Sequence, residues 1–134
     1  MFESGGVLGT GELAAVVAGL ARLDPAVGDG ERVEQIRLLE ALKAAAGAAQ
    51  ARVTAAFAAS QEATQRAAGT PAGRIGRGIA AQVGLARGES PARAVGYAGW
   101  ARVLVAELPH TLAPLTRGEI SEWRAMIVPG KPAG

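Results

Sequence analysis

The sequence predicts an all-α protein: an alanine-rich helical bundle with one long helix and a helix-turn-helix-like unit. Hydrophobic residues make up 49% of the 134 residues but aromatic residues only 4%, and alanine is the most frequent apolar type. Alanine has the highest helix propensity of all residues. Larger apolar side chains recur every three or four positions between breaks rich in glycine and proline, which is the period of an amphipathic helix.

Residues 1–30 are predicted to form an N-terminal segment with one short helix. Thr10 is a suitable N-cap for that helix, and the Asp24-Pro25 pair stops it. Four apolar residues at helical spacing give the helix one apolar face: Leu13, Val16, Val17 and Leu20.

A helical domain over residues 31–128 begins with a long helix at about 31–67, interrupted only by Gly47. Its apolar positions follow a spacing of three or four that is close to a heptad seam. Two interpretations stay open: a bundle helix packed on its own chain, or a seam that forms a homodimer through residues 31–67. Phe57 is the only large side chain in the second half of the helix, which makes it a candidate for the core. The seam consists of Val33, Ile36, Leu39, Leu42, Ala46, Ala49, Val53 and Phe57.

Residues 74–108 have the outline of a helix-turn-helix. Ser90 and Pro91 are typical of a helix start, and Gly84 and Ala94 supply small residues around a turn at Gly88. The first of the two helices is expected to make its apolar contacts through Ile79, Val83 and Leu85, and the second through a heptad-like face that includes Tyr97 and Leu104. Two residues depart from the pattern, because they are polar where this motif normally has apolar side chains: Arg87 and Glu89. The alternative is a helix hairpin with a solvated basic edge.

Two short helices are predicted within residues 111–128. The first runs from Leu112 to Arg117, with His110 or Thr111 as its cap and Gly118 after its end, and the second runs from Glu122 to Val128. Residues 129–134 contain two prolines and two glycines and are predicted to be a flexible tail.

Positive charge is concentrated in one part of the chain. Residues 66–102 contain six arginines and a single acid, Glu89, whereas residues 1–65 carry a net negative charge. Such asymmetry indicates a surface that binds a polyanion, and a helix-turn-helix makes DNA the expected partner. An arginine in the first turn of the second helix reaches a base edge in that motif, while the others contact phosphates. The predicted DNA-binding residues are Arg74, Arg77, Arg87 and Arg93.

No catalytic, metal or cofactor site is predicted. The sequence has no cysteine and a single histidine, His110, which lacks a second ligand or catalytic partner. The glycines at 73, 76 and 78 precede no Lys-Ser/Thr pair, so a phosphate-binding P-loop is excluded. Trp100 and Trp123 are expected to pack in the core rather than stack on bases. No apolar run is long enough to span a membrane, and we expect a soluble, cytoplasmic protein.

Three stretches of the chain resemble a known family. They are LLEALKAAAGAAQARVTAAFAASQ, QRAAGTPAGRIGRGIAAQVGLARGESP and LPHTLAPLTRGEISEWRA. In order and spacing they resemble the N-terminal domain of unknown function in the repetitive-element proteins of mycobacteria and related actinobacteria. In that family the domain precedes an HNH endonuclease domain. The resemblance covers most of residues 31–127.

The resemblance implies association with DNA but carries no nuclease activity to this chain. An HNH site needs several histidines, usually with Asn or Asp, and this sequence has one histidine and no asparagine. We therefore expect a non-catalytic, DNA-associated helical domain, a truncated remnant of an HNH-type protein. The alternatives are a helical dimerisation scaffold that binds no nucleic acid, and a degenerate product without a selected function.

Overall fold

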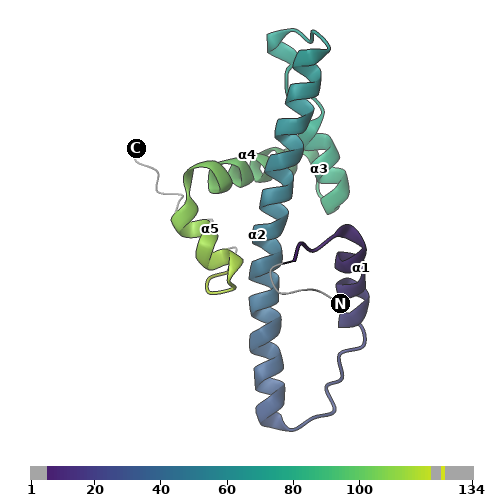
Figure 1. Cartoon of the computed structure of the whole chain (residues 1–134), viewed down its shortest axis with the longest axis vertical. Helices are drawn as coiled ribbons and strands as arrows, with labels where there is room; N and C mark the ends of the chain where they lie inside the picture. Colours follow the sequence, from purple (N-terminus) through teal and green to yellow (C-terminus); the bar gives the residue numbers. More distant parts are fainter. Residues whose placement is uncertain (1–5, 122–124, 126–134) are drawn as a thin grey trace. The chain divides into compact units, whose positions relative to one another are not determined.

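The computed structural model describes residues 6–121 and residue 125. The described residues form five α-helices and no strand, so the predicted all-α class is confirmed (Figure 1). The chain divides into two compact units, residues 1–36 and residues 37–134, which are described separately. The elements are α1 (Thr10–Leu20), α2 (Asp29–Ala67), the 3-10 turn η1 (Ala72–Arg74), α3 (Ile79–Arg87), α4 (Pro91–Glu107) and α5 (Pro109–Thr116).

In the first unit, α1 forms where the sequence predicts it but with a different cap. Gly9, not Thr10, is the N-cap, and its backbone N–H donates to Glu12 Oε1 at 2.7 Å. An acid in the first turn suits this position because it faces the positive end of the helix dipole. The four residues of the apolar face all remain exposed, from 38% for Val16 to 64% for Val17.

The connection between α1 and α2 is fixed by polar contacts within the same unit. Asp24 Oδ1 accepts from the backbone N–H of Ala26 at 2.9 Å, and Arg32 Nε donates to the carbonyl of Pro25 at 2.9 Å. The long helix then begins at Asp29, two residues before the predicted start, and ends at Ala67 as predicted.

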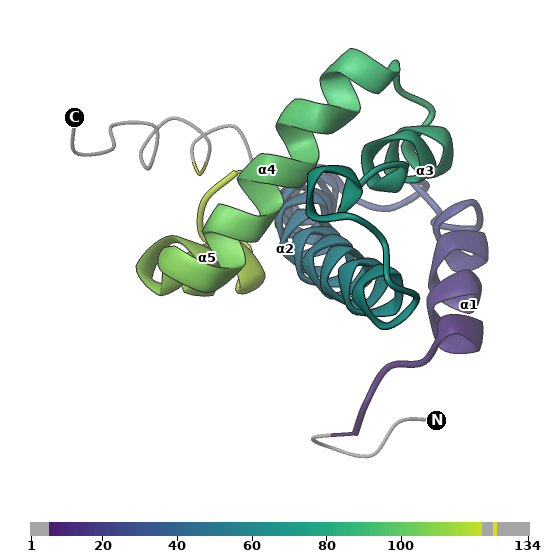
Figure 2. The ribbon, with the colours of Figure 1, turned by 90° about the horizontal axis from the view of Figure 1, so that it is seen from above.

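In the second unit, α3 and α5 lie on opposite sides of α2, and α4 packs against both of them (Figures 1 and 2). The core is built mainly from alanines, with Leu104 and Leu115 as its largest fully buried side chains. Because alanine projects little from the helix, the backbones approach closely, and each residue buries little apolar surface. The residues of α2 that face this core are Ala44, Gly47, Ala48, Ala51, Thr54 and Ala58.

The predicted seam on α2 lies only at the edge of the face that packs on the chain's own core, since four of its eight residues are partly buried and four are exposed. Ala51 is fully buried, whereas Val53 is 68% exposed, and two positions correspond to about 200° around a helix. Val33 and Ile36 are also exposed, and Phe57 is half-buried at the margin of the core. The heptad pattern therefore located an apolar stripe correctly but not the face that is buried. The buried face consists of small residues, which stand out little from the exposed alanines of the same helix in hydrophobicity.

The helix-turn-helix-like unit has the cap and the close contact that the sequence predicts. The hydroxyl of Ser90 accepts from the backbone N–H of Arg93 at 3.3 Å, and Gly88 adopts a positive φ of 71° in the turn. A Cβ on Gly84 would lie 2.9 Å from the Cβ of Ala94, so only glycine fits there without displacement. The prediction for Leu85 is wrong, because its side chain points away from the core and is 84% exposed.

The C-terminal elements match in part. α5 begins at Pro109, with Leu108 as N-cap, so neither His110 nor Thr111 caps it. Gly118 follows the helix with a φ of +74°, and a Cβ there would lie 2.8 Å from the backbone oxygen of Ala41. The predicted helix at 122–128 lies outside the described residues apart from Ala125, as do Trp123 and the tail at 129–134.

Candidate nucleic-acid interface

The four arginines predicted to bind DNA fall into two groups. The side chains of Arg74, Arg77 and Arg93 are exposed and have no hydrogen bond or ion pair to any described residue. Arg87 instead lies against its own fold, with 19% of its side chain exposed.

Arg87 belongs to a polar network at the turn between α3 and α4. Its Nη2 donates to Glu89 Oε2 at 2.9 Å, and its guanidinium lies 3.6 Å from the centroid of the Tyr97 ring. It also donates to Gln50 Oε1 of α2. The hydrogen bond from Arg87 is the main cause that lowers the pKa of Glu89, against an opposing effect of desolvation.

This network accounts for the two polar residues that departed from the helix-turn-helix pattern. Arg87 and Glu89 neutralise each other, and the aromatic face of Tyr97 covers the cation. The expectation that Arg87 contacts a phosphate is therefore revised, because its Nη1 and Nη2 already bind partners inside the unit and its side chain is mostly buried.

The loop that carries Arg74 and Arg77 is fixed to the C-terminal part of α2 by one glutamine. Gln65 Oε1 accepts from the backbone N–H of Gly76 at 2.6 Å, and its Nε2 donates to the carbonyl of Arg77 at 3.1 Å. Gly76 and Gly78 have φ values of 93° and 89°, a region that side-chain-bearing residues rarely adopt. Two arginines are thus held at the surface by a loop with a defined backbone.

Glu62, three positions before Gln65 on α2, pairs with two further arginines. Arg102 of α4 donates two parallel hydrogen bonds to its carboxylate, at 2.8 and 3.0 Å, and Arg66 lies at 4.0 Å. A Cβ on Gly76 would lie 3.6 Å from Glu62 Oε2, so the loop also reaches this carboxylate. The hydrogen bond with Arg102 lowers the pKa of Glu62 and raises the pKa of Arg102. We use the name basic cluster for the two arginines that pair with Glu62, Arg66 and Arg102, together with the two exposed arginines of the adjacent loop, Arg74 and Arg77.

The exposed face of α4 offers few groups that read bases. The polar side chains that bind base edges in the major groove are chiefly Arg, Lys, Asn and Gln. Of these types α4 has only Arg93 in its first turn and Arg102, which is paired with Glu62. Apart from Glu107 at its last position, its other exposed residues are small or apolar: Pro91, Ala92, Val95, Gly96, Gly99, Val103 and Ala106.

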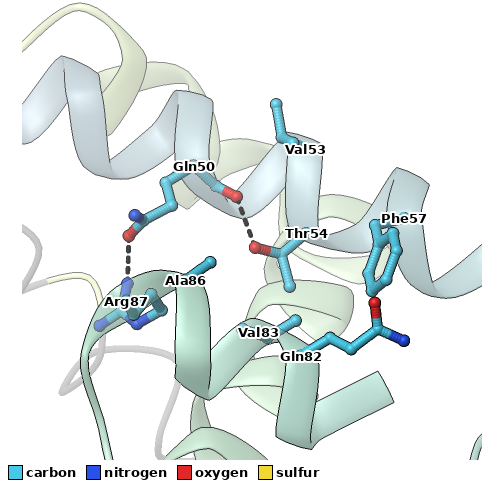
Figure 3. A pocket seen from close by; sticks show the side chains of 8 residues that line it. All are labelled: Gln50, Val53, Thr54, Phe57, Gln82, Val83, Ala86 and Arg87. Carbon is cyan, nitrogen blue, oxygen red and sulfur yellow. Dashed lines mark hydrogen bonds between the residues drawn. The ribbon is translucent and has the colours of Figure 1, made fainter. Parts of the chain in front are cut away.

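A cavity of about 370 Å³ lies between α2 and α3 (Figure 3). Gln50 and Arg87 lie at one end of it, and Phe57 and Gln82 at the other. The guanidinium at its polar end is already bound by Glu89 and Gln50, so the cavity adds no cation to the basic cluster. The remaining lining residues are Val53, Thr54, Val83 and Ala86.

No other site emerges from the described part of the chain. Within it, no three His, Cys, Asp or Glu side chains are grouped so that they could hold a metal ion. None of its helices is both long and apolar enough to cross a membrane. Comparison with protein-family models, with curated proteins and with solved structures gives no match to this chain.

Sequence reasoning missed two arginines of the basic cluster and Glu62, which pairs with both. Arg66 and Arg102 contributed to the charge asymmetry but were not selected, because they lie outside the helix-turn-helix pattern. Glu62 and Arg66 are four positions apart on a helix, a spacing that favours an ion pair and would have indicated part of the cluster. The pairing of Glu62 with Arg102, 40 residues away, has no local signal.

Proposed function

We propose that this chain is a non-catalytic, DNA-associated helical domain that binds the phosphate backbone through the basic cluster. The observation that carries the proposal is the position of the loop that holds the exposed Arg74 and Arg77. Gln65 fixes the backbone of this loop to the same stretch of α2 on which Glu62 pairs with two further arginines. Arginine presents a planar fork of N–H donors that matches phosphate oxygens, and each phosphate contact releases counterions from DNA. The resemblance to a domain that precedes an HNH nuclease supports the same proposal.

The binding is expected to be insensitive to DNA sequence. Phosphate contacts fix the position of a protein on the duplex but carry no base information. The exposed face of α4 is dominated by small apolar residues, and its one base-reading group without a partner among the described residues is Arg93. The proposed role is therefore to position a helical domain on DNA rather than to select a site.

Fluorescence anisotropy with two duplexes of unrelated sequence tests this proposal. At about 0.1 M salt, the double variant Arg74→Ala/Arg77→Ala is expected to weaken binding by on the order of tenfold per lost contact, equally for both duplexes. The matched control is Arg22→Ala/Lys43→Ala, which removes the same charge from exposed positions elsewhere. Absence of binding at low salt, or equal losses in the two double variants, overturns the proposal.

A second candidate function is homodimerisation through α2, and one observation favours it. α2 packs on its own chain with its alanine face, and Val53 of the predicted seam stays 68% exposed. A dimer that uses this stripe would show a concentration-dependent sedimentation coefficient, and Val53→Asp would remove that dependence. A monomer at all concentrations excludes it.

A further inference from the structure

Glu62 is the acid that pairs with two arginines of the basic cluster, and it is less exposed than either of them. Its side chain is 16% exposed, whereas those of Arg102 and Arg66 are 45% and 64% exposed. Its two carboxylate oxygens accept one hydrogen bond each from Arg102, at 2.8 and 3.0 Å. This fork-to-fork geometry is also the one in which arginine binds two oxygens of a phosphate.

We propose that Glu62 is an internal competitor for phosphate, which holds Arg102 in the unbound protein and limits how tightly the basic cluster binds DNA. The inference rests on the proposed function and adds a restraint to it. When a phosphate approaches, its oxygens accept from the exposed side of the Arg102 guanidinium and displace one or both hydrogen bonds to Glu62. The carboxylate remains close below and repels the incoming anion.

The restraint has two physical consequences. Arg74 and Arg77, which have no acidic partner among the described residues, make the first phosphate contacts, and Arg102 contributes only part of a contact. Removing the negative charge of Glu62 releases Arg102 to make a full contact, and it also removes a repulsion. The affinity for DNA then rises although no cation has been added.

The test is to compare Glu62→Gln with Glu119→Gln. Glu119 is a matched control, because it also accepts two hydrogen bonds from an arginine, Arg117 at 2.8 and 2.9 Å, and both substitutions change the net charge by one. We expect Glu62→Gln to bind duplex DNA several-fold more tightly, with a salt dependence steeper by up to about one unit, and Glu119→Gln to bind like the unmodified chain. Adding Arg102→Ala to Glu62→Gln should abolish most of the gain.

The results distinguish a failure of the competitor role of Glu62 from a failure of the proposed DNA binding. If the unmodified chain binds through Arg74 and Arg77 but Glu62→Gln behaves like Glu119→Gln, the competitor role is wrong and the proposed function stands. If neither the unmodified chain nor Glu62→Gln binds DNA, the proposed function itself fails. A gain that persists in full after Arg102→Ala also contradicts the competitor role. Glu62→Ala serves as a second variant, checked like the first by circular dichroism, in case the side-chain carbonyl of Gln still accepts a hydrogen bond from Arg102.

Discussion

The two ends of α3 contain similar residues in different environments. At the turn end, which comprises Arg87 and Glu89, an ion pair is mostly buried under Tyr97 and joined to α2 through Gln50. At the loop end, which comprises Arg74 and Arg77, the arginines are exposed and only the backbone is tied to α2. Burial and pairing, rather than the number of arginines, therefore decide which arginines can bind an external anion.

The largest expected effect on stability is at the turn end. Gly84→Ala should reduce the free energy of unfolding by about 1–3 kcal/mol, because the new methyl group would lie 2.9 Å from Ala94 Cβ and 3.2 Å from the carbonyl of Glu89. The matched control is Gly96→Ala in α4, where no atom lies within 4 Å of the added Cβ. That change should stabilise the protein by about 0.5–1 kcal/mol, since alanine is the better helix former. Urea denaturation measures both, and equal effects would contradict the close approach of α3 and α4.

Arg87→Ala and Arg77→Ala separate the two ends of α3 by two readouts. Arg87→Ala leaves Glu89 without its cation and uncovers Tyr97, so the midpoint of thermal unfolding should fall. Arg77→Ala should leave the midpoint unchanged and weaken DNA binding. In the folded Arg87→Ala variant, the salt dependence of binding should match that of the unmodified chain. If the slope of log affinity against log salt fell by about one unit in this variant, Arg87 would be shown to contact a phosphate.

Acid should weaken both the ion pair at the turn end of α3 and the pairing of Glu62 with Arg102. The pKa values of Glu62 and Glu89 are lowered by hydrogen bonds from Arg102 and Arg87, so both carboxyls stay ionised to a lower pH in the folded state than in the unfolded chain. A lowered carboxyl pKa stabilises the fold above the pKa of the unfolded chain, near 4.5, and this contribution is lost as the pH falls through the folded value. Thermal unfolding from pH 7 to pH 3 should therefore show a midpoint that is constant at first and decreases below about pH 4.5. A midpoint that increases below that pH would contradict the pairings.

The smallest expected effect is that of Arg93→Ala. Arg93 is exposed in the first turn of α4, but Glu89 lies near enough for the charge of Arg93 to contribute to its lowered pKa. We expect a loss of affinity clearly below the roughly tenfold of a full phosphate contact. A loss that differs strongly between two DNA sequences would instead show that Arg93 reads a base.

The sequence predicted the helices well and their packing less well. Helix caps and breaks such as Ser90-Pro91 and Gly118 are local signals. The helices that begin or end at them lie close to their predicted positions. The buried face of α2 was not predicted, because Ala48 and Ala51 differ from exposed alanines only in their surroundings. For the same reason the charge tally located the basic region but could not distinguish the paired Arg87 from the exposed Arg77.

Whether the loop end of α3 meets DNA can be measured by the salt dependence of binding. The slope of log affinity against log salt should be about two units shallower for Arg74→Ala/Arg77→Ala than for the unmodified chain. It should be unchanged for Arg22→Ala/Lys43→Ala. If both double variants gave the slope of the unmodified chain, the loop end of α3 would not be the surface that meets DNA.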